Sequence, residues 1–120
     1  MTILSYKDLA VWQKAMDLVT EIYQLVKLLP DDEKYALSDQ MRRAAVSVPS
    51  NIAEGQQRKS SKEFANFLSI ARGSVAELET QLLICIRLDY LSNQQIENAN
   101  HMCQEVGRMV SSLIKKIDSK

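Results

Sequence analysis

Four stretches of apolar residues recur at alternating steps of three and four, and this spacing restricts the chain to a helical fold. Short links near residues 29–34, 56–60 and 89–92 separate the stretches, and none shows the two-residue alternation of a strand. Only three glycines and two prolines interrupt the 120 residues. Because short links make neighbouring helices antiparallel, we predict an all-α, antiparallel up-down-up-down four-helix bundle, with residues 1–120 as one domain.

The same spacing predicts which residues form the core. They are Leu9, Trp12, Met16, Val19, Tyr23 and Val26 in the first stretch; Leu37, Met41, Ala45, Val48 and Ile52 in the second; Phe64, Leu68, Ala71, Val75, Leu78, Leu82 and Cys85 in the third; and Ile96, Ala99, Cys103, Val106, Val110, Leu113 and Ile117 in the fourth. If the third and fourth stretches fold as antiparallel helices, the two cysteines lie about 9 Å apart along the bundle axis. This separation is too large for a disulfide bond. Both are therefore expected to be inert core thiols.

Polar residues mark the expected helix starts. Ser60 with Glu63, and Ser92 with Gln95, have the spacing of a capping box. Ser5 is placed to cap the first helix. These positions predict where three of the four helices begin.

The composition argues against two classes of protein, dedicated nucleic-acid binders and membrane-spanning proteins. Fifteen Lys and Arg balance fifteen Asp and Glu, and zero net charge is unusual for a dedicated nucleic-acid binder. No run approaches the length of apolar sequence that crosses a membrane, and residues 1–12 lack the pattern of a signal peptide. We therefore expect a cytoplasmic protein.

The residues needed for catalysis are missing. The chain has one histidine, His101, and neither the Glu-x-x-His pairs of a di-iron bundle nor a zinc-ligand spacing. No phosphate-binding glycine loop or nucleophile elbow is present. We expect a protein that is not an enzyme and has no catalytic residue, metal or cofactor.

The segment "RRAAVSVPSNIAEGQQR" (42–58) departs from a simple bundle helix. Pro49 lies in its middle, where a proline costs about 3 kcal/mol, yet the apolar pattern continues to Ile52. We therefore expect a continued, kinked helix, with Gly55 as a C-terminal cap or bend. Gly73, brought level with Ala44 by antiparallel folding, is expected to allow close packing between the second and third helices.

Polar residues also form a stripe on this segment: Gln40, Arg43, Ser47, Asn51, Glu54 and Arg58. A solvated helix face is one interpretation. Short side chains of poor helix propensity beside a costly proline favour a packed or contacted face instead. The residues assigned to this interface or kink stripe are Gln40, Ser47, Pro49, Ser50, Asn51, Glu54, Gly73 and Ser74.

Six basic residues form a candidate nucleic-acid-binding set: Arg42, Arg43, Arg58, Lys59, Lys62 and Arg72. If these residues share one face of the bundle, they can bind phosphate groups together. If they are spread around the bundle, they are expected to pair with nearby carboxylates instead. The acidic block at 31–33 and the basic block at 58–62 lie at opposite ends of the second helix, so charge segregation is feasible.

Three segments carry a family resemblance: "YKDLAVWQKAMDLV" (6–19), "QMRRAAVSVPSNIAEG" (40–55) and "FLSIARGSVAELETQL" (67–82). They resemble the small bacterial four-helix-bundle proteins encoded by intervening sequences of 23S ribosomal RNA genes. The accessory variability determinant protein of diversity-generating retroelements is a distant relative of that family. The resemblance implies an up-down bundle that forms ring-shaped homopentamers, in a family whose members mostly have no established activity.

Two functions follow. The first is a non-enzymatic, homo-oligomeric scaffold, pentameric by the resemblance, whose main partner is itself. The alternative is a module that binds RNA or a ribonucleoprotein through the six basic residues, as the basic retroelement relative implies. Neither interpretation involves a membrane partner.

Overall fold

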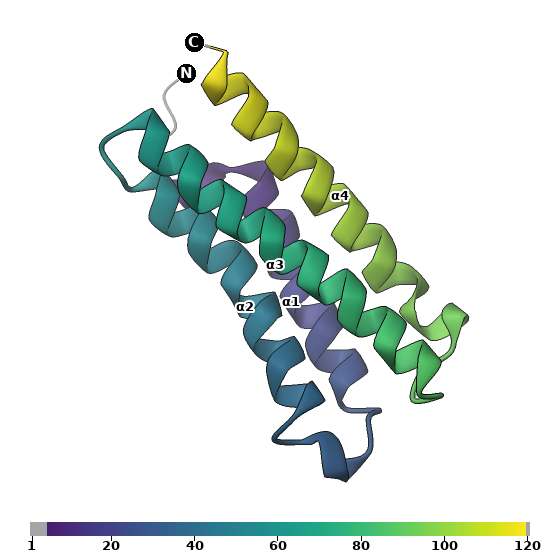
Figure 1. The fold of residues 1–120 in the computed structure, drawn as a ribbon. Helices are drawn as coiled ribbons and strands as arrows, with labels where there is room; N and C mark the ends of the chain where they lie inside the picture. Colours follow the sequence, from purple (N-terminus) through teal and green to yellow (C-terminus); the bar gives the residue numbers. More distant parts are fainter. Residues whose placement is uncertain (1–4, 120) are drawn as a thin grey trace.

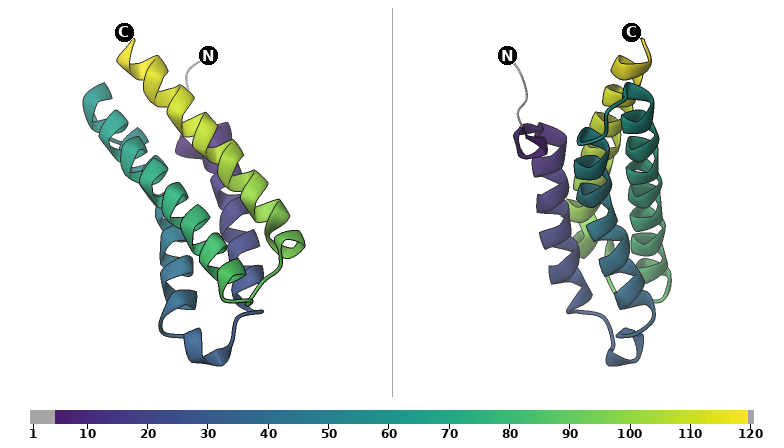
Figure 2. Two further views of the ribbon diagram at one scale, coloured as in Figure 1. Left: turned by 45° about the vertical axis from the view of Figure 1, so that its right-hand side comes forward. Right: turned by 90° about the vertical axis from the view of Figure 1, so that its left-hand side faces the viewer.

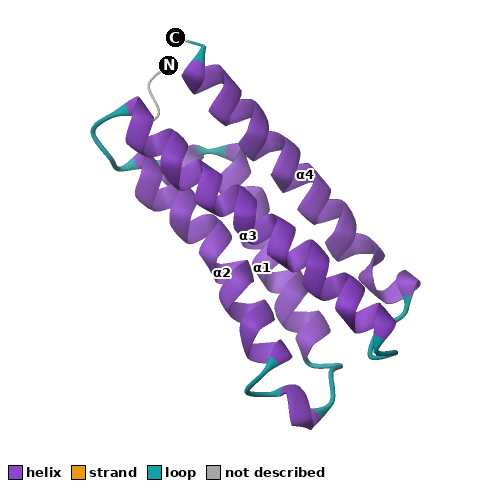
Figure 3. Cartoon of the chain, viewed as in Figure 1, coloured by secondary structure: helices purple, strands orange, loops and turns teal. Residues whose placement is uncertain are grey.

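The computed structural model describes residues 5–119, and four long helices account for most of them (Figures 1 and 3). The helices are α1 (Ala10–Val26), α2 (Leu37–Gln56), α3 (Ser61–Arg87) and α4 (Asn93–Asp118). Two short 3-10 helices, η1 (Tyr6–Asp8) and η2 (Asp31–Glu33), precede α1 and α2. No strand occurs between residues 5 and 119, so the all-α prediction is confirmed.

The helices run alternately up and down. The α2–α3 link lies at the same end as the start of α1 and the end of α4, while the other two links lie at the opposite end (Figures 1 and 2). Helices α2 and α4 each pack against both α1 and α3. Helices α1 and α3 therefore lie diagonally across the core, as in the predicted antiparallel bundle.

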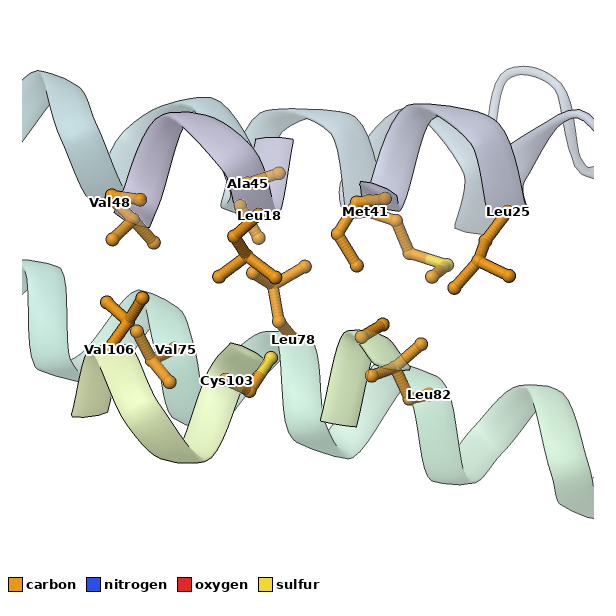
Figure 4. Packing of buried hydrophobic residues seen from close by; sticks show 14 of the residues in the cluster. Leu18, Leu25, Met41, Ala45, Val48, Val75, Leu78, Leu82, Cys103 and Val106 are labelled. Carbon is orange, nitrogen blue, oxygen red and sulfur yellow. The ribbon is translucent and has the colours of Figure 1, made fainter. Parts of the chain in front are cut away.

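The core lies along the bundle axis, where all four helices contribute buried side chains. In Figure 4, side chains of α1 and α2 face those of α3 and α4 across the core. The labelled residues are Leu18, Leu25, Met41, Ala45 and Val48 on one side, and Val75, Leu78, Leu82, Cys103 and Val106 on the other. Burying each large side chain contributes about 1.5–3 kcal/mol. On α2, α3 and α4 the predicted core residues are buried or packed against the core.

On α1 the predicted core stripe is correct only in part. Val26 is buried, and Leu9, Trp12 and Val19 are partly buried and pack against the core. Met16 and Tyr23, which were expected in the core, are 43% and 40% exposed. The fully buried positions belong to a second stripe with the same spacing, which periodicity alone cannot distinguish from the first. Its members are Val11, Ala15, Leu18, Ile22 and Leu25.

Helix α2 continues through Pro49, as predicted. Gly55, however, is neither a cap nor a bend, because it is a buried residue inside α2 and no glycine of residues 5–119 has a positive φ. A Cβ atom at Gly55 would lie 2.7 Å from the Cβ of Phe67 and 3.0 Å from the Cδ1 of Phe64. The missing side chain lets the first turns of α3 pack directly on the end of α2.

Helix starts follow the capping signals closely. Ser92 and Gln95 form a complete capping box at α4. The hydroxyl of Ser60 accepts the backbone N–H of Glu63 at the start of α3. Ser5 caps the short helix η1, whereas α1 begins without a side-chain cap.

A residue that the sequence pattern did not identify contacts the first turn of α2. Glu33 accepts the backbone N–H of Leu37 at 3.2 Å through Oε1 and the hydroxyl of Tyr90 at 2.7 Å through Oε2. The hydrogen bond to Glu33 raises the pKa of Tyr90 above its ordinary value. The same carboxylate thus joins the first turn of α2 and the α1–α2 link to the α3–α4 link.

Substituting Gly55→Ala should lower the free energy of unfolding by about 1–3 kcal/mol, because the new methyl group would overlap the backbone and phenyl groups of α3. Urea unfolding followed by circular dichroism measures the change. Gly107→Ala in α4 is the matched control, since its Cβ would meet only the flexible end of Arg72. A helix-interior alanine there should preserve or raise stability. Equal effects of the two substitutions would contradict the role given to Gly55.

Stability should also fall in alkaline solution. Burial raises the pKa of the free thiols from an ordinary 9.0 to about 11 for Cys85 and about 12 for Cys103. Above the unfolded pKa, the unfolded chain loses these protons while the folded chain keeps them. The free energy of unfolding should therefore drop by up to about 1.4 kcal/mol per pH unit for each cysteine.

Urea unfolding in reductant at about pH 8 and about pH 10 measures this slope. The variant with Cys85→Ala and Cys103→Ala should show a clearly shallower fall. Parallel slopes for the two proteins would show that the buried thiols do not cause the loss of stability.

Candidate interaction surfaces

An apolar groove of about 330 Å³ runs between α1 and α2 beside Pro49. We call it the α1–α2 groove, and its lining residues are Tyr6, Trp12, Met16, Val19, Val46, Pro49, Ser50 and Ala53. The rings of Tyr6 and Trp12 meet edge to face, 5.4 Å apart. Met16 from α1 and Val46 from α2 are each more than two-fifths exposed. The outward stripe of α1 therefore forms one wall of an unpartnered apolar surface.

A second apolar surface lies on α3. We call it the α3 outer face, and it comprises the exposed residues Ile70, Gly73, Ala76, Thr80, Leu83 and Ile84. The exposed charged residues Glu77 and Arg87 lie on the same side of the helix. Ile70 is 53% exposed and Leu83 is 64% exposed. Because α3 lies diagonally opposite α1, this face points away from the outward stripe of α1. These two apolar surfaces thus lie on different sides of the bundle, apart from a third apolar groove between the start of α1 and the end of α4.

Gly73 does not lie where the sequence placed it. A Cβ atom built on it would have no atom of residues 5–119 within 4 Å, so the predicted close packing against Ala44 is wrong. The register of α2 and α3 instead places Ser74 opposite Ser47. Gly73 therefore faces open space in the middle of the α3 outer face, with no packing reason inside the chain.

A polar seam joins α2 to α3. The hydroxyl oxygens of Ser47 and Ser74 are hydrogen-bonded at 2.8 Å, and the Asn51 amide donates to the carbonyl and the hydroxyl of Ser47 at 2.8 and 2.9 Å. Farther along α3, the buried amide of Gln81 donates to Glu77 at 3.3 Å, while its oxygen has no partner in the described part of the chain. This part of the predicted stripe is a contact within the chain.

The rest of the predicted stripe lies elsewhere. Pro49 and Ser50 line the α1–α2 groove. Gln40 and Glu54 are exposed, and Glu54 accepts a hydrogen bond from Arg58 at 3.0 Å. The stripe is therefore divided between the seam, the groove and solvent.

Three of the six basic residues pair with an acid three or four residues earlier in the sequence. Arg42 and Arg43 lie 3.8 and 3.0 Å from the carboxylate of Asp39. Arg58 pairs with Glu54 at 3.0 Å, and its guanidinium also lies over the ring of Phe67, 4.8 Å from the centroid.

The basic set occupies three separate places. Arg42 lies near the start of α2, 14 residues before its end at Gln56, which is about 21 Å at helical rise. Arg58 and Lys59 lie in the α2–α3 link, and Lys62 lies in the first turn of α3. Arg72 turns toward α4, where its Nε donates to the hydroxyl of Ser111 at 3.3 Å. The structure does not bring the six residues together on one face.

Charge is nevertheless segregated along the bundle. The half that holds the α2–α3 link comprises residues 5–15, 49–73 and 104–119, with nine Lys and Arg against five Asp and Glu. The other half, residues 16–48 and 74–103, has five against ten. Sequence reasoning missed the contribution of Lys115 and Lys116, because only the fold brings the last turns of α4 beside the α2–α3 link.

The described residues form no recognisable metal site. Among residues 5–119, no three His, Cys, Asp or Glu side chains are grouped to hold a metal ion. His101 is exposed on α4. No helix within the described range has the length and apolar character needed to span a membrane.

Comparison with known proteins identifies a family and a similar solved structure. A family model described as "23S rRNA-intervening sequence protein" matches residues 7–112. A crystal structure from Bacteroides thetaiotaomicron, of a protein of unknown function from the S23 ribosomal protein family, is 32% identical in sequence. It superposes with a TM-score of 0.82, covering 88% of this chain and 99% of that chain. No curated protein matches.

Proposed function

The chain belongs to the family of 23S rRNA-intervening sequence proteins, and on this premise we propose that it is a non-enzymatic scaffold that assembles into a homo-oligomeric ring. Five copies is the number that the sequence resemblance implies. The observation that carries the proposal is the presence of two exposed apolar surfaces, the α1–α2 groove and the α3 outer face, on different sides of one bundle.

Two different surfaces suit a head-to-tail contact. Such a contact joins one patch of a subunit to another patch of the next, and it gives a closed ring when the rotation between subunits closes. The α1–α2 groove is concave, whereas the α3 outer face is a helix surface with projecting Leu83 and Ile84. We propose that the α3 outer face of one subunit packs into the α1–α2 groove of the next.

Exposed apolar side chains are concentrated on these surfaces. Of the nine large hydrophobic residues exposed in the described part of the chain, five lie there: Met16, Val46, Ile70, Leu83 and Ile84. Removing such side chains from water stabilises a contact by about 25 cal/mol per Å². Gly73 supports the same contact, because a mid-helix glycine costs about 1 kcal/mol relative to alanine. A neighbouring subunit that approaches the α3 backbone closely gives that glycine a function.

Light scattering after size-exclusion chromatography tests the assembly. The wild-type protein should have the mass of several 13.6 kDa chains. Met16→Glu should disrupt the contact from the side of the α1–α2 groove, and Ile84→Glu should disrupt it from the side of the α3 outer face. Each substitution would bury a charge in an apolar contact. Tyr35→Glu is the matched control, because this aromatic residue is 86% exposed outside both surfaces and should not change the mass.

Mixing the two broken variants makes the test specific. Each retains the surface that the other has lost, so a head-to-tail contact predicts a heterodimer from two monomeric variants. A wild-type protein that stays monomeric at every concentration would refute the assembly. An assembly that survives both substitutions, or variants that do not combine, would refute this pair of surfaces.

A second candidate function, RNA or ribonucleoprotein binding, is favoured by the segregation of charge. The basic half of the bundle presents Lys59, Lys62, Lys115 and Lys116 around one end. These lysines form no ion pair with another described residue. Repeated around a ring, weak phosphate contacts would add up by avidity. A protein of zero net charge can bind RNA in this way because its acidic groups are concentrated in the other half.

Replacing these four lysines by alanine should weaken binding of a labelled ribosomal RNA fragment and flatten its salt dependence between about 50 and 200 mM salt. Fluorescence anisotropy measures both quantities. Lys27→Ala with Lys34→Ala, at the acidic end, should leave the slope unchanged. Wild-type protein that binds no RNA at low salt would leave assembly as the sole proposed function.

A further inference from the structure

A polar groove of about 400 Å³ lies between α3 and α4 and shares no lining residue with either apolar surface. Its lining residues are Arg72, Glu79, Gln104, Gly107, Arg108, Ser111 and Ser112. Two arginines and two serines are therefore exposed to the same space. No residue of this groove except Arg72 was singled out by the sequence.

Arg72 is held against α4 by two features of that helix. Its Nε donates to the hydroxyl of Ser111 at 3.3 Å. Its guanidinium also lies on the surface of Gly107, where a Cβ atom would be 3.1 Å from Cζ and 3.2 Å from Nη1. Gly107 is a buried residue in the interior of α4, where glycine is less favourable than alanine by about 1 kcal/mol. The glycine provides the space that the guanidinium occupies.

Arg72 has no acidic partner. Arg42, Arg43 and Arg58 each form an ion pair, but no carboxylate of residues 5–119 lies within 4.0 Å of Arg72 or Arg108. Only Nε of Arg72 is used in a hydrogen bond with another described side chain. The remaining N–H groups of its guanidinium are available to a ligand. Two unpaired arginines in the basic half of the bundle favour an anion.

The geometry suits one phosphate group better than an extended polyanion. A guanidinium presents paired N–H donors that match phosphate oxygens, and Ser111 and Ser112 add hydroxyl donors nearby. Glu79 lies seven residues from Arg72 along α3, about 10 Å at helical rise. Its carboxylate would repel a chain of phosphates that followed the groove toward it.

We propose that the α3–α4 groove binds a single phosphate-type oxyanion between Arg72 and Arg108. Ser111 both orients Arg72 and lies within the site. The proposal concerns a separate site from the lysines assigned to RNA, and it holds whether or not the chain assembles.

Titration of the full chain with inorganic phosphate tests the site. In ¹⁵N–¹H spectra, the Nε–Hε signals of Arg72 and Arg108 should shift with one saturable dissociation constant. Arg43, which is exposed at the other end and paired with Asp39, is the internal reference and should not follow that curve. Sodium chloride at matched ionic strength controls for general screening.

Single substitutions distinguish a loss of phosphate binding from a loss of stability. Arg72→Ala should weaken phosphate binding by about tenfold or more, the effect expected for losing a charge-assisted hydrogen bond. Gly107→Ala should weaken binding by displacing the guanidinium while stability is preserved or raised. Glu79→Gln should tighten binding, because it removes a nearby negative charge. Arg43→Ala is the matched control and should bind phosphate like the wild-type protein.

A competition experiment identifies the source of the phosphate group. An unlabelled ribosomal RNA fragment should displace inorganic phosphate from Arg72 if a nucleic-acid backbone supplies the group. A phosphate-induced shift that persists at saturating RNA would identify the free anion as the ligand. The proposal is overturned if no saturable shift occurs, if all arginine signals move together, or if Arg72→Ala binds phosphate as well as the wild-type protein.

Discussion

Close packing of α2 against α3 is the contact on which the other features of the bundle depend. Gly55 lets the two helices meet at their shared link, and the hydroxyls of Ser47 and Ser74 fix their register near the middle of α2. Helix α2 is in close contact with α3 along more of its length than with α1. The looser approach of α1 leaves the α1–α2 groove open on the surface. An interaction surface thus arises where α2 packs less extensively on its neighbour.

The sequence predicted most of the fold because helix periodicity, short links and capping residues all indicate the same topology. It failed on α1, where two stripes have equal spacing and only packing against the other helices decides which is buried. It also misplaced Gly73, since a register estimated from the link was off by a few residues. The basic end could be foreseen only in part, because Lys115 and Lys116 are far from the α2–α3 link in sequence. Arg108, Ser111 and Ser112 carry no recognisable motif.

The three glycines show how one residue type serves three physical purposes. Gly55 is required inside the chain, because a methyl group would overlap α3. Gly107 accommodates a side chain, the guanidinium of Arg72. Gly73 has open space around it, so no contact inside the chain accounts for its place in a helix. A glycine that weakens a helix without an internal partner is a useful indication of an external one.

The hydrogen bond between Tyr90 and Glu33 has a consequence for how the bundle moves. At that end the bond joins Glu33, in the α1–α2 link, to Tyr90, in the α3–α4 link. Each link connects one pair of helices, so the bond joins two pairs that the chain does not connect there. Local opening of one link must break this bond, and the unfolding of the two links is therefore coupled.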